Sequence, residues 1–156
     1  MRIVKNINKQ WTFIKENVGY EKAILVEGEH IDLPHTWNGL DGQNGGNNYY
    51  KGTCWYIHSF PKESIALNSH IFLEFKGVNA SATIYFNDKC LGAHDGGYST
   101  FRFEITELFD DINTIVVAVD NSKNERIYPQ TADFTFYGGI YRDVNIISVP
   151  DRKSVV

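Results

Sequence analysis

Short runs of β-branched and aromatic residues recur along this 156-residue chain, and clusters of Gly, Asn and Asp separate them. Runs of this kind between turn-forming residues predict β-strands. The sequence offers one short helical turn, at 105–109. Many short strands without helical segments favour an all-β sandwich. The predicted strands cover 10–15, 21–27, 54–60, 69–76, 80–86, 89–93, 100–104, 113–120 and 143–149.

The residue patterns of two predicted strands indicate what covers them. In the strand at 69–76, Ile71, Leu73 and Phe75 fall on one face, as in a strand with that face in the core. In the strand at 113–120 both faces are apolar. We therefore expect this second strand to be covered on both sides.

A hairpin turn is the most specific local prediction. Asn87 and Asp88 separate two strand-like runs, and both residue types tolerate the positive φ that a type I′ turn requires. The sequence therefore predicts a tight hairpin at this pair.

Length and charge exclude several classes of protein. A chain of 156 residues can bury a sizeable core as one domain, but it cannot also contain a (β/α)₈ barrel, which typically needs about 250 residues. The formal net charge of −4, with both signs interspersed, provides no field that would attract nucleic acid or an anionic membrane. The sequence has neither an apolar run of membrane-helix length nor the apolar stretch of a signal peptide. We expect a cytoplasmic protein, or an exported one whose signal has been removed.

Two irregular stretches interrupt the predicted strands. The stretch 38–53 is rich in glycine and lacks apolar periodicity, and 121–142 is also irregular. Long loops in compact domains are commonly functional or mobile. We expect one domain over 1–150, followed at 151–156 by the start of a linker to a further domain.

The cysteines and histidines do not indicate a metal or cofactor site. Cys54 and Cys90 lie in apolar strand-like runs, where we expect buried free thiols rather than a disulfide framework. His35 and the pair His94–Asp95 could suggest a metal, but a site needs three or four convergent ligands and the spacing does not supply them. We expect neither a metal nor a cofactor.

The segment 132–144 combines aromatic residues, a glycine pair and charges in a way that core burial alone would not specify. Gly138 and Gly139 allow positive φ and let another chain or a ligand approach closely. Asp133 and Arg142 are polar groups among large rings. This combination indicates a functional segment.

Six blocks of sequence occur in order along the chain: LPHTWN (33–38), KGTCWY (51–56), FKGVNA (75–80), NDKCLGAHDGGY (87–98), VDN (119–121) and ADFTFYGGIYRDV (132–144). Together, over roughly 10–149, they resemble glycoside hydrolase family 2, the family of β-galactosidases, β-glucuronidases and β-mannosidases. The resemblance implies a jelly-roll β-sandwich, galactose-binding-domain-like, known as the sugar-binding domain. It also implies that an immunoglobulin-like domain and a catalytic (β/α)₈ barrel follow in the parent chain.

The resemblance also implies roles for individual residues. In β-galactosidases of this family an Asp just before the Gly-Ile-Arg block reaches into the galactose pocket of the barrel, and Asp133 matches that position. An Asn upstream plays a similar role, and Asn38 is its best match. The matching Arg is structural, so we expect Arg142 to pair with carboxylates such as Asp143 or Asp120 or to pack at a domain contact, rather than to bind a substrate carboxylate.

No catalytic residue is expected in this chain. Retaining glycoside hydrolysis needs two carboxyl groups about 5–5.5 Å apart, and in the family that the chain resembles both are glutamates of the barrel. The parent protein would hydrolyse O-glycosyl bonds, whereas this chain alone should be inactive.

The favoured interpretation is the amino-terminal carbohydrate-binding domain of a retaining family 2 glycoside hydrolase, in the first place a β-galactosidase. It would line one side of the substrate pocket and support domain assembly. Its partners would be a β-glycoside or oligosaccharide substrate and the following domains of the parent chain, with a homo-oligomer as an open option. A stand-alone carbohydrate-binding module and a purely structural domain are the alternatives. Continuation of the gene past Val156 into a barrel would exclude the first alternative, and binding of a saccharide would exclude the second.

Overall fold

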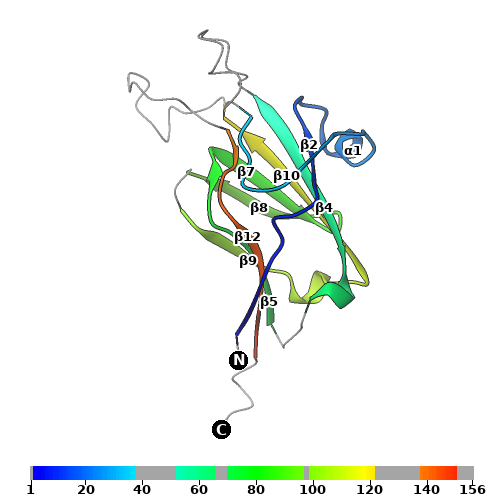
Figure 1. Cartoon of the computed structure of the whole chain (residues 1–156), viewed down its shortest axis with the longest axis vertical. Coiled ribbons are helices and arrows are strands. Elements are labelled where there is room, and N and C mark those ends of the chain that lie inside the picture. Colours follow the sequence, from blue (N-terminus) through cyan, green and yellow to red (C-terminus); the bar gives the residue numbers. More distant parts are fainter. Residues whose placement is uncertain (1, 38–51, 66–69, 97–98, 122–137, 151–156) are drawn as a thin grey trace.

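The computed structural model describes residues 2–37, 52–65, 70–96, 99–121 and 138–150. These residues form a jelly-roll β-sandwich whose two main antiparallel sheets pack face to face (Figure 1), as the sequence predicts. The smaller sheet has the strand order β1 (Ile3–Asn6), β12 (Val144–Val149), β5 (His70–Phe75) and β9 (Phe101–Glu104). The larger sheet has the order β3 (Glu29–Ile31), β2 (Trp11–Ile14), β4 (Thr53–Pro61), β10 (Ile112–Asp120), β7 (Ser81–Phe86) and β8 (Lys89–Asp95).

Short elements complete the described ranges. No helix among them is long and apolar enough to span a membrane. The 3₁₀ turn that follows β9 lies where the sequence predicts a helical turn. The short elements are the paired strands β6 (Val78–Asn79) and β11 (Gly139–Ile140), the helical turn α1 (Tyr20–Ala23), and the 3₁₀ turns Lys62–Ser64 and Thr106–Leu108.

The core lies between the facing sides of the two sheets and follows the alternation of their strands. In β5, Ile71, Leu73 and Phe75 point into it, which confirms the predicted pattern. Alternate residues of β10 and β7 face them because successive side chains of a strand point to opposite sides. Burial of one large apolar side chain stabilises the fold by about 1.5–3 kcal/mol. The largest fully buried side chains include Trp11, Tyr56, Phe75, Phe86, Leu73, Ile84, Ile105 and Ile115.

The other face of β5 carries a buried charge. Glu74 is 3% exposed, and its carboxylate accepts hydrogen bonds from Arg102 at 2.7 Å and from Asn145 at 3.0 Å. Burial alone would raise the pKa of Glu74, but these two partners lower it below its ordinary value. The carboxylate thus links β5 to its neighbours β9 and β12.

The outward face of the larger sheet is covered in part by α1 (Figure 1). Val116 of β10 is 1% exposed and belongs to a second apolar cluster with Ile14, Ala23 and Trp55. This cluster confirms the prediction that the strand at 113–120 is covered on both sides.

The β7–β8 hairpin has the predicted turn. Asn87 and Asp88 have φ values of 48° and 69°, and Phe86 pairs with Lys89 across them. Positive φ at both central residues is the requirement of a type I′ turn, so the prediction is confirmed.

The prediction of a strand at 21–27 is wrong. The chain forms α1 there and continues into a segment in which Leu25 is 81% exposed. Ala23 is the residue that packs onto the sheet. The neighbouring Ile24 and Val26 are also exposed, so this apolar run lies on the outside of the sandwich, where it has no strand partner.

The sequence prediction also missed the short strands β1, β3, β6 and β11. Strand β1 is held by pairing with β12 and is mostly exposed, so it shows no alternation of apolar and polar residues. Of the two free cysteines, Cys54 is buried as expected, but Cys90 is exposed. Its exposure reflects its place in β8, the edge strand of the larger sheet.

Candidate functional site

The predicted site residues Asn38 and Asp133, like 151–156, lie outside the described residues. The structure does describe how the chain next to them is held. The N–H of Trp37, which directly precedes Asn38, donates to the carbonyl of Gly138 at 3.1 Å. Gly138 in turn follows Asp133 by a short stretch of chain. The described residue before Asn38 is therefore hydrogen-bonded to the first described residue after Asp133.

Two further backbone contacts extend this arrangement. The His35 N–H donates to the Ile140 carbonyl at 2.8 Å. Gly52 directly precedes β4, and Asn121 directly follows β10. The Gly52 N–H donates to Asn121 Oδ1 at 3.0 Å, and the Asn121 N–H donates to the Gly52 carbonyl at 3.3 Å. The chain ends that flank 38–51 and 122–137 are thus paired with each other.

The glycine pair is required by its surroundings. A Cβ on Gly138 would collide with the indole of Trp37, and a Cβ on Gly139 would collide with the carbonyl of His35. Gly139 also has a φ of +139°, which side chains other than glycine rarely adopt. This confirms the predicted close approach, and it is residues 35–37 of the same chain that approach.

Tyr56 of β4 lies beneath this contact with its ring buried. Its hydroxyl is 2.7 Å from His35 Nδ1 and makes a backbone hydrogen bond with Ile140. Burial raises the pKa of Tyr56 well above its ordinary value, and burial also lowers the pKa of His35. Both side chains are therefore uncharged at pH 7. The hydroxyl accepts the Ile140 N–H, and the tautomer of His35 decides whether the hydroxyl donates to Nδ1 or accepts from it.

Aromatic rings pack around this pair. The ring of Phe13 lies 4.6 Å from His35, 5.0 Å from Tyr56 and 6.0 Å from Trp37, between centroids. Trp37 is 4% exposed, so its indole belongs to the core and offers no face to a ligand. The cluster, termed the junction, consists of Phe13, His35, Trp37, Tyr56, Gly138 and Gly139.

The junction is a rigid base rather than a reactive centre, because its polar groups satisfy one another. In the described part of the chain, no group of three or more His, Cys, Asp or Glu side chains could hold a metal ion. Sequence reasoning considered His35 only as a metal ligand and gave Tyr56 no role. The available signal was their presence in the blocks 33–38 and 51–56.

The expected ion pair of Arg142 with Asp143 or Asp120 is wrong. Arg142 is exposed, and its guanidinium lies 5.6 Å from the centroid of the Tyr141 ring. The Asp143 carboxylate instead accepts a hydrogen bond from Asn8 Nδ2 at 2.9 Å. The aromatic neighbour attracts the cation through its π face and takes the place of the carboxylate.

Comparison with known proteins gives consistent results. The family described as "Glycosyl hydrolases family 2, sugar binding domain" matches residues 16–150. The chain is 36% identical over 90% of its length to a β-glucuronidase of Bacteroides fragilis. It is 34% identical over 94% of its length to a β-galactosidase of Thermoanaerobacterium thermosulfurigenes. The chain covers 20% and 21% of these two relatives, about a fifth of each.

A solved structure is similar to the chain in both fold and sequence. The crystal structure of a Bacteroides uniformis β-glucuronidase matches with a TM-score of 0.81 and 35% sequence identity, over 96% of this chain and 18% of that chain. The family match spans most of the chain, and the relatives exceed 30% identity. The chain therefore belongs to glycoside hydrolase family 2, as a sugar-binding domain of that family.

Proposed function

We propose that the chain forms one side of the substrate pocket of a larger, retaining β-glycosidase and supports the assembly of its domains. The junction is the observation that carries this proposal. It fixes Trp37, which precedes Asn38, against Gly138, which follows Asp133 in the chain. A base of this kind limits the freedom that must be lost when the sugar binds.

Asp133 is the proposed contact to a sugar hydroxyl, and Asn38 is the proposed second contact. The support is the match of both residues to the family blocks and their proximity along the chain to Gly138 and Trp37. A charge-assisted hydrogen bond of this type contributes about 1.5–3 kcal/mol. The reaction itself would depend on glutamates of a barrel that follows this domain of 1–150 in the parent chain.

For the sugar, we propose a β-glucuronide ahead of the β-galactoside that the sequence resemblance first suggests. The Bacteroides fragilis relative and the Bacteroides uniformis structure are both named β-glucuronidases. A β-galactoside remains the second candidate because the Thermoanaerobacterium thermosulfurigenes relative is named a β-galactosidase.

The test is Asp133→Ala in the full-length enzyme, assayed with p-nitrophenyl β-D-glucuronide and p-nitrophenyl β-D-galactoside. We expect kcat/KM for the preferred substrate to fall by about 10- to 100-fold if the hydrogen bond tightens in the transition state. The melting temperature should change little. Asp111→Ala, at an exposed position beside β10, is the matched control and should leave both quantities unchanged.

Unchanged kcat/KM with a lowered melting temperature would contradict the role proposed for Asp133. Preference for the galactoside would contradict only the choice of sugar. The two parts of the proposal can therefore fail separately.

A further inference from the structure

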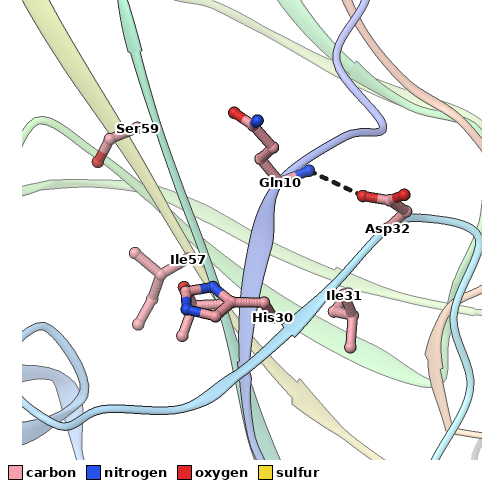
Figure 2. A pocket seen from close by; sticks show the side chains of 7 residues that line it. Gln10, His30, Ile31, Asp32, Ile57 and Ser59 are labelled. Atoms are coloured by element: carbon pink, nitrogen blue, oxygen red, sulfur yellow. Dashed lines mark hydrogen bonds between the residues drawn. The ribbon is translucent and has the colours of Figure 1, made fainter.

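A groove lies on the outward face of the larger sheet, where β3, β2 and β4 run side by side (Figure 2). Its volume is about 640 Å³, within the range of about 300–1,000 Å³ typical of small-molecule sites. Thr12 and Ile57 line it as a cross-strand pair. Their neighbours Phe13 and Tyr56 face the core. The groove and the junction therefore lie on opposite faces of the same sheet.

Polar side chains in the groove have unused hydrogen-bonding capacity. Within the described ranges, the side chains of Gln10, Thr12 and His30 make no hydrogen bond. Figure 2 shows the imidazole of His30 extending from β3 toward Ile57 of β4. Amide, hydroxyl and imidazole groups can both donate and accept, so these groups suit a ligand that does the same.

Asp32 adds a fixed negative charge to the groove. Its Oδ1 accepts the Gln10 backbone N–H at 3.0 Å, which Figure 2 shows, and its Oδ2 lies 3.4 Å from Lys9 Nζ. The backbone hydrogen bond holds the pKa of Asp32 below its ordinary value, with a smaller contribution from Lys9 and some opposition from desolvation. The carboxylate is thus charged at neutral pH and can accept a hydroxyl proton, while Lys9 offsets part of its charge.

The remaining lining residues give the groove an apolar part. Ile57 presents aliphatic surface, whereas the side chain of Ile31 packs against the core although the residue borders the groove. Ser59 shares a hydrogen bond of 3.1 Å with Thr114. A single carboxylate cannot hold a divalent cation such as Ca²⁺, which binds six or more oxygen ligands. An uncharged molecule with alternating hydroxyl groups and C–H surface matches the lining best.

We propose that this groove binds a neutral saccharide, at a site separate from the substrate pocket of the proposed function. The groove has the side chain of Ile57 in place of aromatic rings, and its hydrogen bonds compete with water, so each contact contributes little. We expect a Kd in the millimolar range, about −4 kcal/mol of binding free energy at 1 mM.

The test follows backbone amide signals of the ¹⁵N-labelled 156-residue chain during titration with lactose and, separately, with methyl β-D-glucuronide. Lactose should shift the amides of Thr12, His30, Ile31 and Ile57. Methyl β-D-glucuronide should shift them less because the described lining contains no Lys or Arg to bind its carboxylate. Loss of one hydrogen bond in Thr12→Val should weaken lactose binding by about threefold to tenfold.

Thr83→Val is the matched control, since Thr83 is a partly exposed residue on the outward face of β7, outside this groove. It should bind lactose as the unmodified chain does. A Thr12→Val variant whose spectrum remains dispersed but whose affinity is unchanged would overturn the proposal, as would shifts confined to other strands. Neither result depends on Asp133, so failure here leaves the kinetic test of the proposed function intact.

Discussion

The junction and the β7–β8 hairpin both depend on residues with positive φ, but for different physical reasons. At the hairpin, Asn87 and Asp88 adopt φ values of 48° and 69° because a two-residue turn between antiparallel strands requires them. At the junction, Gly139 has a φ of +139° and lies against His35 and Tyr56. The first conformation is required by the local turn, with added support from the hydrogen bonds of Asn87 to residues 108–114, whereas the second is required by segments distant along the chain. The hairpin should therefore accept other turn residues, whereas the junction should accept only glycine.

The largest expected effect is that of Gly139→Ala. The added Cβ would face both backbone strain and a collision with the His35 carbonyl and the Tyr56 hydroxyl, and each of these costs about 1–3 kcal/mol. We expect a loss of about 3 kcal/mol in the free energy of unfolding, which lowers the melting temperature of a chain of this size by roughly 10 °C. Urea and thermal unfolding measure both quantities.

Gly96→Ala separates the two contributions. Gly96 has a φ of +110°, but a Cβ there would meet nothing within 4 Å. This variant should therefore show the strain alone, about 1 kcal/mol. An equal loss in the two variants would show that close packing at the junction has no part in the requirement for glycine.

Asn87→Ala should have the second-largest effect. The Asn87 amide donates to the Leu108 carbonyl at 2.8 Å and to Asn113 Oδ1 at 3.0 Å, and its Oδ1 accepts the Thr114 N–H at 2.8 Å. Loss of these bonds together with strain at positive φ should cost about 2 kcal/mol. Asn87→Gly removes the bonds but keeps the conformation, so it should cost less. Equal costs would show that the turn geometry contributes nothing.

The same contrast explains how much of the fold the sequence predicts. The Asn87–Asp88 turn and the alternation of Ile71, Leu73 and Phe75 are local patterns, and both predictions are confirmed. The apolar run at 21–27 was misassigned because its side chains are mostly exposed on the outside of the sheet. Whether such a run is covered depends on packing that no local pattern encodes.

The candidate site divides in the same way. The glycine pair at 138–139 signals a close approach, but the sequence does not name Trp37 and His35 as the approaching residues, because they lie far away along the chain. The Tyr56–His35 hydrogen bond likewise joins different blocks. Asp133 and Asn38 stay predictions, since they come from resemblance and lie outside the described residues.

The two regions should also respond to opposite extremes of pH. Burial lowers the pKa of His35, with partial opposition from Glu29, and burial likewise lowers that of His58. A depressed folded-state pKa gives stability that is present above the unfolded value of about 6.5 and is lost as pH falls through the folded value. We therefore expect the free energy of unfolding to decrease as the pH falls below 6.5. The pKa of Glu74 is lowered from 4.5, so Glu74 contributes to the pH dependence only at lower pH.

His35→Gln, measured by urea unfolding across this range, should reduce the pH dependence. His30→Gln is the control because His30 is exposed. A pH dependence that persists in His35→Gln and disappears in His30→Gln would contradict the assignment to the junction.

The smallest expected effect is that of Tyr20→Phe at the hairpin. The Tyr20 hydroxyl of α1 donates to Asp88 Oδ1 at 2.7 Å, and desolvation together with that carboxylate raises the pKa of Tyr20 to about 12. A raised folded-state pKa gives stability that is fully present below the unfolded value of about 10 and is lost as pH rises through the folded value.

Because the bond is exposed to solvent, Tyr20→Phe should cost less than about 1 kcal/mol at pH 7, and the difference from the unmodified chain should vanish between about pH 10 and 12. Urea unfolding at each pH measures the difference, and ultraviolet absorbance of the phenolate follows the ionisation. A difference from the unmodified chain that stays constant from pH 7 to pH 12 would contradict the role given to the Tyr20–Asp88 bond in raising this pKa.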